Sequence, residues 1–382
     1  MKSLESSRVG TIISQPGGYE AFIPKNLHPD GADITIDAEC MKLLSEAERA
    51  LGELKGITEL LPNPDLFVAF YVRKEALLSS QIEGTQCSLD EVIRVDETTH
   101  TTHQVEEVVN YIKAMKYGLE RLQELPMSLR LVHEIHEKLM EKVRGSDKTP
   151  GEYKRTQNWI GPPGGTLQEA NYVPPPPDIM IELMGDFENY YHSKDDLPDL
   201  IKTAVLHSHF ETIHPYLDGN GRLGRLLITF MLCEKNILSR PLLYLSLFFK
   251  KYRTEYYEYL MNIRFKGQWE EWIKFFLTGV RSTSLEASST AREILQLQTK
   301  DRNAIKKHLR KHKLAISCYD YVCQQPILTI PQTVKTLDST YPTVQKVFAG
   351  FHTLGILTPY GSRERNKIFQ YENYLDIMRR GT

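Results

Sequence analysis

The chain has 382 residues, a formal net charge of −2, 41% hydrophobic and 25% charged residues. This composition is that of a globular protein, and about 150 residues per domain predicts two or three domains. No run approaches about 18 apolar residues and the first 16 residues lack an apolar core, so we expect neither a membrane span nor secretion. Five scattered cysteines without a CxxC pair predict reduced thiols in a cytoplasmic protein, not a disulfide frame or zinc site.

The charge is unevenly distributed along the chain. Residues 300–382 contain 14 Lys and Arg against 6 Asp and Glu, a net of +8, whereas the remainder contains 33 against 43, a net of −10. Only the tail is therefore expected to attract an acidic polymer.

The N-terminal half is predicted to be helical after an initial extended arm of some thirty residues. Apolar residues recur at helical spacing from Asp37 onward. Further helices are predicted at 65–82, with Gly84 as a stop signal, and at 104–124 and 128–143. Residues 153–173, which flank Gly-Pro-Pro-Gly-Gly, are predicted to form a β-hairpin.

The C-terminal half continues with predicted helices at 179–191, 200–213, 222–234 and 269–280. The Ser-rich segment 281–290 is expected to be a joint, followed by helices at 331–337 and 342–354 and a polar hairpin around Gly361, which together resemble a winged helix-turn-helix. We therefore predict a mainly α fold, with an N-terminal helical region (1–115), a core (116–285) and a small C-terminal domain (300–382).

Residues 214–225 read His-Pro-Tyr-Leu-Asp-Gly-Asn-Gly-Arg-Leu-Gly-Arg. The embedded GxGxxG lacks the preceding strand and the later acid of a dinucleotide fingerprint, and no Gly-Lys-Ser/Thr follows, so neither a Rossmann site nor a Walker A loop is predicted. A Gly-rich turn that leads into a helix still directs free N–H groups toward an anion. Arg222 and Arg225 can bind phosphate oxygens, and Asp218 can hold Mg²⁺.

The segment resembles the Fic family signature His-Pro-Phe-x-Asp/Glu-Gly-Asn-Gly-Arg-x-x-Arg. Tyr216 replaces the usual Phe, and its hydroxyl is expected to find a partner. The resemblance extends from about Leu61 to Leu277. It implies a Fic-type helical core with a β-hairpin flap, and transfer of AMP from ATP to a Ser, Thr or Tyr hydroxyl of a protein, including possible self-modification.

The resemblance also implies a role for each residue of the motif. His214 would be the general base, Asp218 the ligand of Mg²⁺, and Asn220 with the amides of Gly219 and Gly221 the cradle for the α- and β-phosphates. Arg222 would bind near the β-phosphate and Arg225 the γ-phosphate. A histidine with an ordinary pKa near 6.5 suits a base at neutral pH.

An upstream segment, Ser79-Ser-Gln-Ile-Glu83-Gly84, matches the inhibitory pattern of the same family. Ser79 and Glu83 are four residues apart and share a helix face. The resemblance implies that Glu83 pairs with Arg225, which would occupy the guanidinium that the γ-phosphate needs. An exposed glutamate at a helix end is the alternative.

Other sequence features can be interpreted in more than one way. The 153–173 hairpin is either a flap that aligns the target backbone or a structural hairpin. Tyr257 either stacks on adenine or packs in the core. His207 and His209 are interpreted as helix residues, not zinc ligands, and His133 and His136 as a helix surface or a satisfied pair.

The tail residues suit nucleic-acid recognition or protein docking. Polar and basic side chains fall on the second helix of the predicted helix-turn-helix and on its wing; they are Thr343, Gln345, Lys346, His352, Arg363, Arg365 and Lys367. Two rivals to AMP transfer stay open: a DNA-binding regulator whose site senses ATP, and a phosphotransferase on the same fold. A homodimer is plausible from the resemblance.

Overall fold

The computed structural model describes residues 4–27, 33–93, 102–162, 164–194, 196–360 and 367–381. The chain divides into two compact units. Unit 1 comprises residues 1–52 and 71–284, and unit 2 comprises 53–70 and 285–382. The motif and the segment around Glu83 both belong to unit 1, whereas the basic tail belongs to unit 2.

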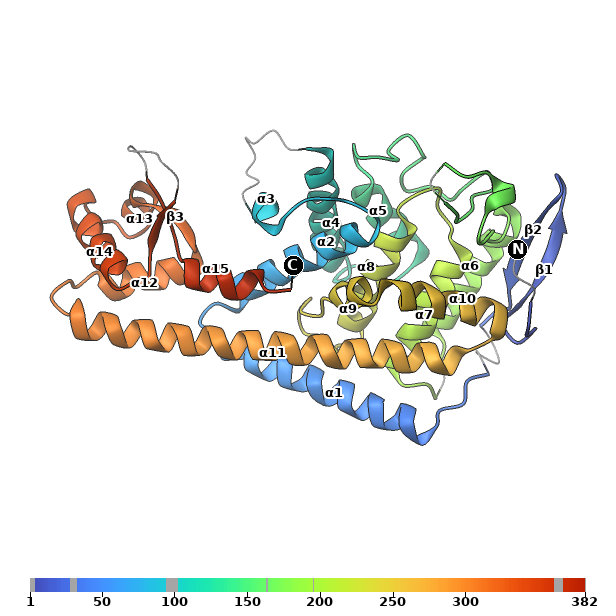
Figure 1. The fold of residues 1–382 in the computed structure, drawn as a ribbon, viewed down its shortest axis with the longest axis horizontal. Helices are drawn as coiled ribbons and strands as arrows, with labels where there is room; N and C mark the ends of the chain where they lie inside the picture. Colours follow the sequence, from blue (N-terminus) through green and yellow to red (C-terminus); the bar gives the residue numbers. More distant parts are fainter. Residues whose placement is uncertain are drawn as a thin grey trace. The chain divides into compact units, whose positions relative to one another are not determined.

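Helices dominate both units, which confirms the predicted mainly α fold. In chain order through unit 1 and the helices that it shares with unit 2, the elements are β1 (Gly10–Gln15), β2 (Tyr19–Pro24), α1 (Ala38–Glu59), α2 (Pro64–Ile82), α3 (Leu89–Ile93), α4 (His103–Arg121), α5 (Leu129–Leu139), the 3₁₀ turn η1 (Leu167–Glu169), α6 (Pro177–His192), α7 (Asp199–Ile213), α8 (Asn220–Glu234), α9 (Ser246–Lys251), α10 (Arg253–Lys266) and α11 (Trp269–His308) (Figure 1). Among the described residues no helix is both long enough and apolar enough to cross a membrane.

Helices α7 and α8 form the centre of unit 1. Every residue of α7 from Leu200 to Ile213 is buried, and most of α8 is buried as well. A helix that is covered on all sides must lie inside its domain. The loop that joins the two helices carries the motif, so both of its ends are anchored in the core.

The N-terminal arm, predicted to be extended, is a β-hairpin, which the sequence analysis did not predict. Strands β1 and β2 pair antiparallel from Gly10 opposite Pro24 to Gln15 opposite Tyr19. Gly17 and Gly18 both have positive φ in the turn between the strands. The Pro-Gly-Gly turn, flanked by apolar residues, favours a hairpin. The sequence interpretation overlooked this signal because it considered only the lack of helical periodicity.

The segment 153–173 is less regular than the predicted hairpin flap. Ile160 and Tyr172 form a single antiparallel bridge, and η1 lies between them. Prolines supply no N–H donor to a strand ladder, and Pro162 and Pro174 stand just beyond the two bridged positions. Pairing therefore stops after one bridge.

The boundary between the two units falls after Ser284, within the predicted joint at 281–290, but the segment itself is helical. Helix α11 runs unbroken from Trp269 to His308 (Figure 1). Thr283, Ser284 and Ser288 are fully or almost fully buried, and Thr283 returns its hydroxyl to the carbonyl of Gly279 at 2.9 Å. Close packing of small side chains outweighs their weak helix propensity.

Unit 2 combines the end of α11 with α12 (Ala315–Gln324), β3 (Ile327–Thr329), α13 (Ile330–Thr336), α14 (Tyr341–Thr353), β4 (Thr358–Tyr360), β5 (Ile368–Gln370) and α15 (Glu372–Arg379). Its sheet has the order β3-β5-β4, with both pairings antiparallel. The predicted helices at 331–337 and 342–354 correspond to α13 and α14. Gly361, Arg363 and Arg365 lie outside the described residues, and the winged-helix assignment stays a prediction.

Candidate functional site

The motif begins where α7 ends. His214 caps α7 in the left-handed conformation, with φ of 50°, and its N–H donates to the carbonyl of Phe210 at 2.9 Å. Pro215 follows and cannot continue the helix, because it lacks an N–H donor. A non-glycine residue in this conformation is strained, and such strain is typical of functional positions.

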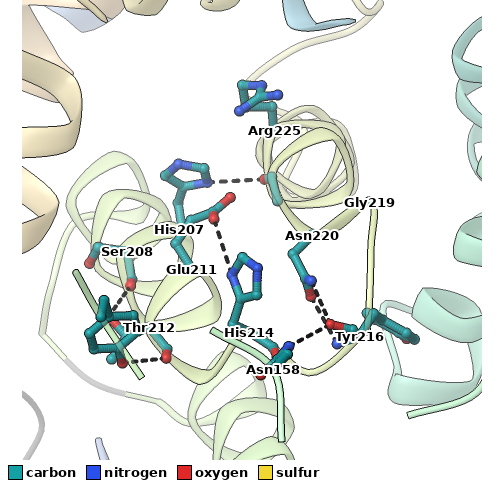
Figure 2. A network of polar contacts seen from close by, with 12 residues as sticks. Asn158, His207, Ser208, Glu211, Thr212, His214, Tyr216, Gly219, Asn220 and Arg225 are labelled. Carbon is teal, nitrogen blue, oxygen red and sulfur yellow. Dashed lines mark hydrogen bonds and ion pairs between the residues drawn. The ribbon is translucent and has the colours of Figure 1, made fainter. Parts of the chain in front are cut away.

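Two asparagines brace the loop. Asn220 accepts the N–H of Tyr216 at 2.9 Å and donates to its carbonyl at 2.8 Å. Asn158 donates to the carbonyl of Tyr216 at 2.8 Å and of His214 at 3.1 Å (Figure 2). The side chain of Asn220 therefore stabilises the loop itself in this structure. The backbone amides at the start of α8 are left to bind an anion.

Tyr216 is buried and its hydroxyl lies 3.0 Å from Nδ1 of His133. The predicted hydroxyl partner is thus present. The ring stacks on His136 with centroids 3.8 Å apart and planes 18° apart. The tyrosine at the usual Phe position is accommodated by two histidines of α5.

His136 is a supporting residue of the motif whose contact with it the sequence interpretation missed. Its Nδ1 accepts the N–H of Gly151 at 2.8 Å, so Nε2 carries the proton and donates to the carbonyl of Asp218 at 3.0 Å. Burial lowers the pKa of His136 to about 4. The residue is therefore neutral and holds the backbone of Asp218. Its HxxH spacing to His133 was visible, but nothing local linked it to a loop 82 residues away.

Asp218 presents a carboxylate at the start of α8. Its Oδ1 accepts the N–H of Gly219 at 2.7 Å, and its Oδ2 lies 3.5 Å from Nζ of Lys148. The side chain is 25% exposed. Among the described residues no group of three or more His, Cys, Asp or Glu side chains is placed to hold a metal. A single accessible carboxylate fits Mg²⁺, which commonly combines one or two carboxylates with substrate phosphates.

Arg222 is buried without adequate partners. Its side chain is 2% exposed, and its Nε and Nη1 have no hydrogen-bond partner. The closest acids are Glu107, at 4.0 Å from Nη1, and Asp218, at 3.8 Å from Nη2. Buried donors are normally satisfied, so these free N–H groups indicate a place for an anion.

Two nitrogens of Arg225, Nε and Nη2, donate to residues at the end of α2. Its Nε donates to Oγ of Ser79 at 2.8 Å, and its Nη2 donates to the Ser79 carbonyl at 3.0 Å and to Oε1 of Glu83 at 2.7 Å. Burial opposes the charge of Arg225, but the Glu83 carboxylate and nearby groups outweigh it and raise the pKa above its ordinary value. The contact between Glu83 and Arg225 that the resemblance implied is present, and Ser79 contacts Arg225 as well.

The carboxylate of Glu83 also lies against the first turn of α8. A Cβ at Gly221 would be 2.4 Å from Oε1 of Glu83. Only glycine therefore permits this approach. Free N–H groups at a helix N-terminus attract anions, so Glu83 occupies a position suited to a phosphate.

His214 faces a second buried carboxylate, that of Glu211 (Figure 2). Nδ1 of His214 lies 4.0 Å from Oε2 of Glu211. Burial, together with the charges of Lys154 and Arg264, lowers the pKa of His214 to about 3. Burial raises the pKa of Glu211 to about 7. His214 is thus neutral at pH 7.

These groups border a cavity of about 1320 Å³ in unit 1. Of the predicted site residues, the lining includes His214, Gly221, Arg225, Tyr257 and Glu83. Asp218, Gly219, Asn220, Arg222 and Ser79 do not line it. Residues 159–161 and 170–172 form one part of the wall and α10 another.

Tyr256 and Tyr257 have different surroundings: Tyr256 packs in the core, whereas Tyr257 is partly exposed. Tyr256 is buried and its hydroxyl donates to Nε2 of His207 at 2.9 Å, while Nδ1 of His207 donates to the carbonyl of Gly224. Tyr257 is 37% exposed and faces the cavity, with the guanidinium of Arg253 5.4 Å from its ring centroid. Stacking of Tyr257 on adenine stays a prediction. His207, interpreted from the sequence as a helix residue, lies in α7, where it is buried and both of its ring nitrogens are hydrogen-bonded.

Comparison with known families agrees with the resemblance of the motif. Residues 41–120 match the Fic/DOC family N-terminal model and residues 126–232 match the Fic/DOC family model. A solved Fic family protein from Desulfovibrio desulfuricans G20 aligns with a TM-score of 0.59 over 88% of this chain and 97% of its own, at 19% identity, which indicates a shared fold. The chain is a Fic family protein.

Among curated relatives, a probable protein adenylyltransferase of Aquifex aeolicus is 28% identical over 179 residues, 45% of this chain and 51% of that protein. A protein adenylyltransferase Fic of Drosophila grimshawi is 27% identical over 258 residues, 64% of this chain and 48% of that protein. The chain thus spans about half the length of the curated relatives that it matches.

Proposed function

We propose that the chain is a protein adenylyltransferase, which transfers AMP from ATP to a Ser, Thr or Tyr hydroxyl of a protein. The observation that carries the proposal is that one cavity is bordered by a neutral imidazole, His214, and by the anion-binding end of α8 with Arg225. A base beside a phosphate cradle is what nucleotidyl transfer to a hydroxyl requires. The names of the curated relatives support the same activity.

Each residue of the site would have its own role in the reaction. His214 accepts the proton of the target hydroxyl, whose oxygen bonds to the α-phosphorus as the bond to the departing pyrophosphate breaks. The amides of α8 hold the phosphate oxygens on which negative charge develops. Arg222 and Arg225 bind the β- and γ-phosphates, and Tyr257 stacks on adenine. Mg²⁺ held by Asp218 would neutralise phosphate charge.

Glu83 is proposed to inhibit this site. Its carboxylate bonds to Arg225 at 2.7 Å and lies where a phosphate would meet the first turn of α8. A γ-phosphate and this carboxylate cannot share the same donors, and two anions in one buried site repel each other. ATP would then bind in an unproductive pose until Glu83 leaves.

The direct test is incubation with ATP labelled at either the α- or the γ-phosphate. Label transferred to protein from the α position alone means AMP transfer, and label from the γ position means a phosphotransferase. We expect α-label on the protein itself, stronger in Glu83→Gly and absent in Glu83→Gly/His214→Ala, which should still bind ATP. Protein label from neither position, in wild type or in Glu83→Gly, would favour a nucleotide sensor over an enzyme.

Glu124→Gly is a matched control for Glu83→Gly. Glu124 is also a turn glutamate that contacts an arginine, Arg121, at 2.7 Å, but its side chain is 73% exposed. Only the Glu83 change should raise transfer. An equal rate in wild type and Glu83→Gly, with α-label present in both, would refute the inhibition.

A second candidate function, docking to a nucleic acid through unit 2, is favoured by one observation. A cavity of about 480 Å³ lies beside the first turn of α14, with Lys346 and Thr343 from that helix on one side and the segment 311–314 on the other. Its titratable lining residues are Lys311, His312, Lys313 and Lys346. The first turn of a recognition helix is where major-groove contacts begin.

Duplex binding by the full chain tests this second proposal. We expect binding that weakens steeply with salt, and a marked loss in Lys311→Glu/Lys346→Glu. Lys42→Glu/Lys116→Glu, in unit 1, makes the same change in net charge and should bind as wild type does. No binding of duplex at low salt would refute the proposal and leave protein docking as the use of unit 2.

A further inference from the structure

Glu211 and His214 face each other with atoms that have no partner. Nδ1 of His214 and Oε1 of Glu211 are buried and neither forms a hydrogen bond. Nδ1 is 4.0 Å from Oε2 of the same carboxylate, about 1 Å beyond hydrogen-bond distance. Both residues border the cavity. Buried polar atoms without partners are uncommon and call for an explanation.

The neighbouring cations do not use this carboxylate. Arg225 donates to Ser79 and Glu83. Arg264 donates to the backbone carbonyl of Glu211 at 2.9 Å and to the Thr212 hydroxyl at 3.2 Å, not to the carboxylate. Oε1 instead packs against Gly224, where a Cβ would be 2.4 Å away. The carboxylate is therefore available to His214.

The surroundings of His214 disfavour a positive charge. The imidazole is largely buried, and Lys154 and Arg264 both act to lower its pKa. A general base must nevertheless become an imidazolium when it accepts a proton. Without an anion at Nδ1, the charge would form beside two cations in a site of low polarity, which is costly.

We propose that Glu211 is a positioning residue for His214: it accepts the Nδ1–H, leaves Nε2 free for the target hydroxyl, and stabilises the imidazolium. This inference rests on the proposed transferase function. The hydroxyl O–H bond breaks and an Nε2–H bond forms, while Nδ1 keeps its own proton and donates it to the carboxylate. No proton passes to Glu211, which acts as an anion throughout. The gap of 4.0 Å closes to a hydrogen bond as the charge develops.

The ionisation of Glu211 has a consequence for pH dependence. Burial and the charge of Glu83 raise its pKa, and the charges of Arg225 and Arg264 lower it, with a net value of about 7. Below that pH a protonated Glu211 cannot stabilise the imidazolium, so transfer should fall as the solution becomes acidic. Removing Glu83 removes a like charge and should move this fall to lower pH.

The kinetic test uses the full chain in the Glu83→Gly background, with kcat for α-label transfer measured from pH 5.5 to 9. We expect Glu83→Gly/Glu211→Gln to lower kcat roughly 10- to 100-fold with little change in KM for ATP, by analogy with carboxylates that orient the histidine ligands of a metal. It should also lose the acidic fall in kcat. Glu83→Gly/Glu75→Gln is the control, since Glu75 is another buried glutamate with a raised pKa but does not line the cavity; it should keep the pH profile.

Two results would overturn the inference while the proposed function survives. One is an active Glu83→Gly protein whose kcat is unaffected by Glu211→Gln. The other is a lower kcat with an unchanged pH profile, which would indicate a structural role only. If no variant transfers α-label, the proposed function fails instead.

If no variant transfers α-label, a measurement that needs no activity still tests whether Glu211 positions His214. Nitrogen-15 NMR of histidine-labelled protein reports which nitrogen of His214 carries the proton, with His214→Gln to assign the signal. We expect the Nδ1–H form in wild type and a mixture of both forms in Glu211→Gln. An Nε2–H form in wild type would contradict the inference.

Discussion

Two arginines three residues apart on α8 have opposite surroundings. Both side chains are 2% exposed. Arg225 meets the end of α2 and has three hydrogen bonds to Ser79 and Glu83. The nearest carboxylate oxygens to Arg222 belong to Asp218, at 3.8 Å, and to Glu107 of α4, at 4.0 Å. Its Nη2 donates to Sδ of Met140 at 3.4 Å, and its Nε and Nη1 have no hydrogen-bond partner.

Under the proposed function, this helix end would carry one regulated and one unregulated phosphate contact. Nε and Nη2 of Arg225 are occupied by Ser79 and Glu83, so we propose that this contact opens when Glu83 moves. Nε and Nη1 of Arg222 have no hydrogen-bond partner, so we propose that this arginine needs no such release.

The largest effect is expected on activity at Arg222. Arg222→Met in the Glu83→Gly background should lower α-label transfer about 10²- to 10³-fold, as for loss of one preorganised donor to a transition-state anion. The measurement is kcat for self-modification. A double variant as active as Glu83→Gly would mean that the bare donors do not meet phosphate.

The second largest effect is expected on the stability of variants at the two arginines. Arg225→Met removes charge-assisted hydrogen bonds and leaves Ser79 unpaired, so the free energy of unfolding should fall by about 2–3 kcal/mol. Arg222→Met removes a buried charge whose nearest carboxylate oxygens are 3.8 and 4.0 Å away, so it should cost less stability than Arg225→Met does. Urea unfolding at pH 7.5 measures both. Equal losses would contradict the contrast.

A pH effect comes third and concerns one histidine on each side of α8. His136 lies on the Arg222 side and His207 on the Arg225 side, with pKa values lowered by burial to about 4 and about 3. Each is neutral when folded but titrates near 6.5 when unfolded, so its contribution is present above pH 6.5 and is lost as the pH falls. From pH 7 to pH 5 each should cost about 2 kcal/mol of stability. Urea unfolding across this range that shows no acidic loss would contradict the neutral states.

The smallest effect concerns the charge of Glu83 alone. Glu83→Gln keeps a hydrogen-bond acceptor for Arg225 but removes the ion pair, so the free energy of unfolding should fall by about 1 kcal/mol. Transfer should rise less than in Glu83→Gly, because the amide still occupies the first turn of α8. Thermal unfolding and α-label transfer measure the two effects. Full activation by Gln would show that charge, not occupancy, inhibits the site.

Much of the helical fold was predictable because the apolar residues of amphipathic helices recur about every 3.6 residues, and α4 and α5 follow that local pattern closely. The errors arose where tertiary packing decides. The Ser-rich part of α11 is helical because its small side chains are buried, and the 160–172 segment forms one bridge because prolines interrupt the pairing. The β1–β2 hairpin had a local signal in its Pro-Gly-Gly turn.

Some features of the candidate site were likewise predictable from the local sequence, whereas others depend on the tertiary structure. Residue types and spacing by themselves determined the motif at 214–225, the turn that presents amides to an anion, and the Ser79–Glu83 spacing on one helix face. These properties are local, since they depend on neighbours in the chain.

Only the tertiary structure decided which groups meet. Glu83 and Arg225 are 142 residues apart in the chain, His136 and Asp218 are 82 apart, and each pair is joined by helix packing. Glu211 and His214 are three residues apart and therefore neighbours by helical spacing, but packing of the surrounding elements buries both side chains. Burial then sets the protonation of both, because the cost of charge depends on the surrounding core and not on the local sequence.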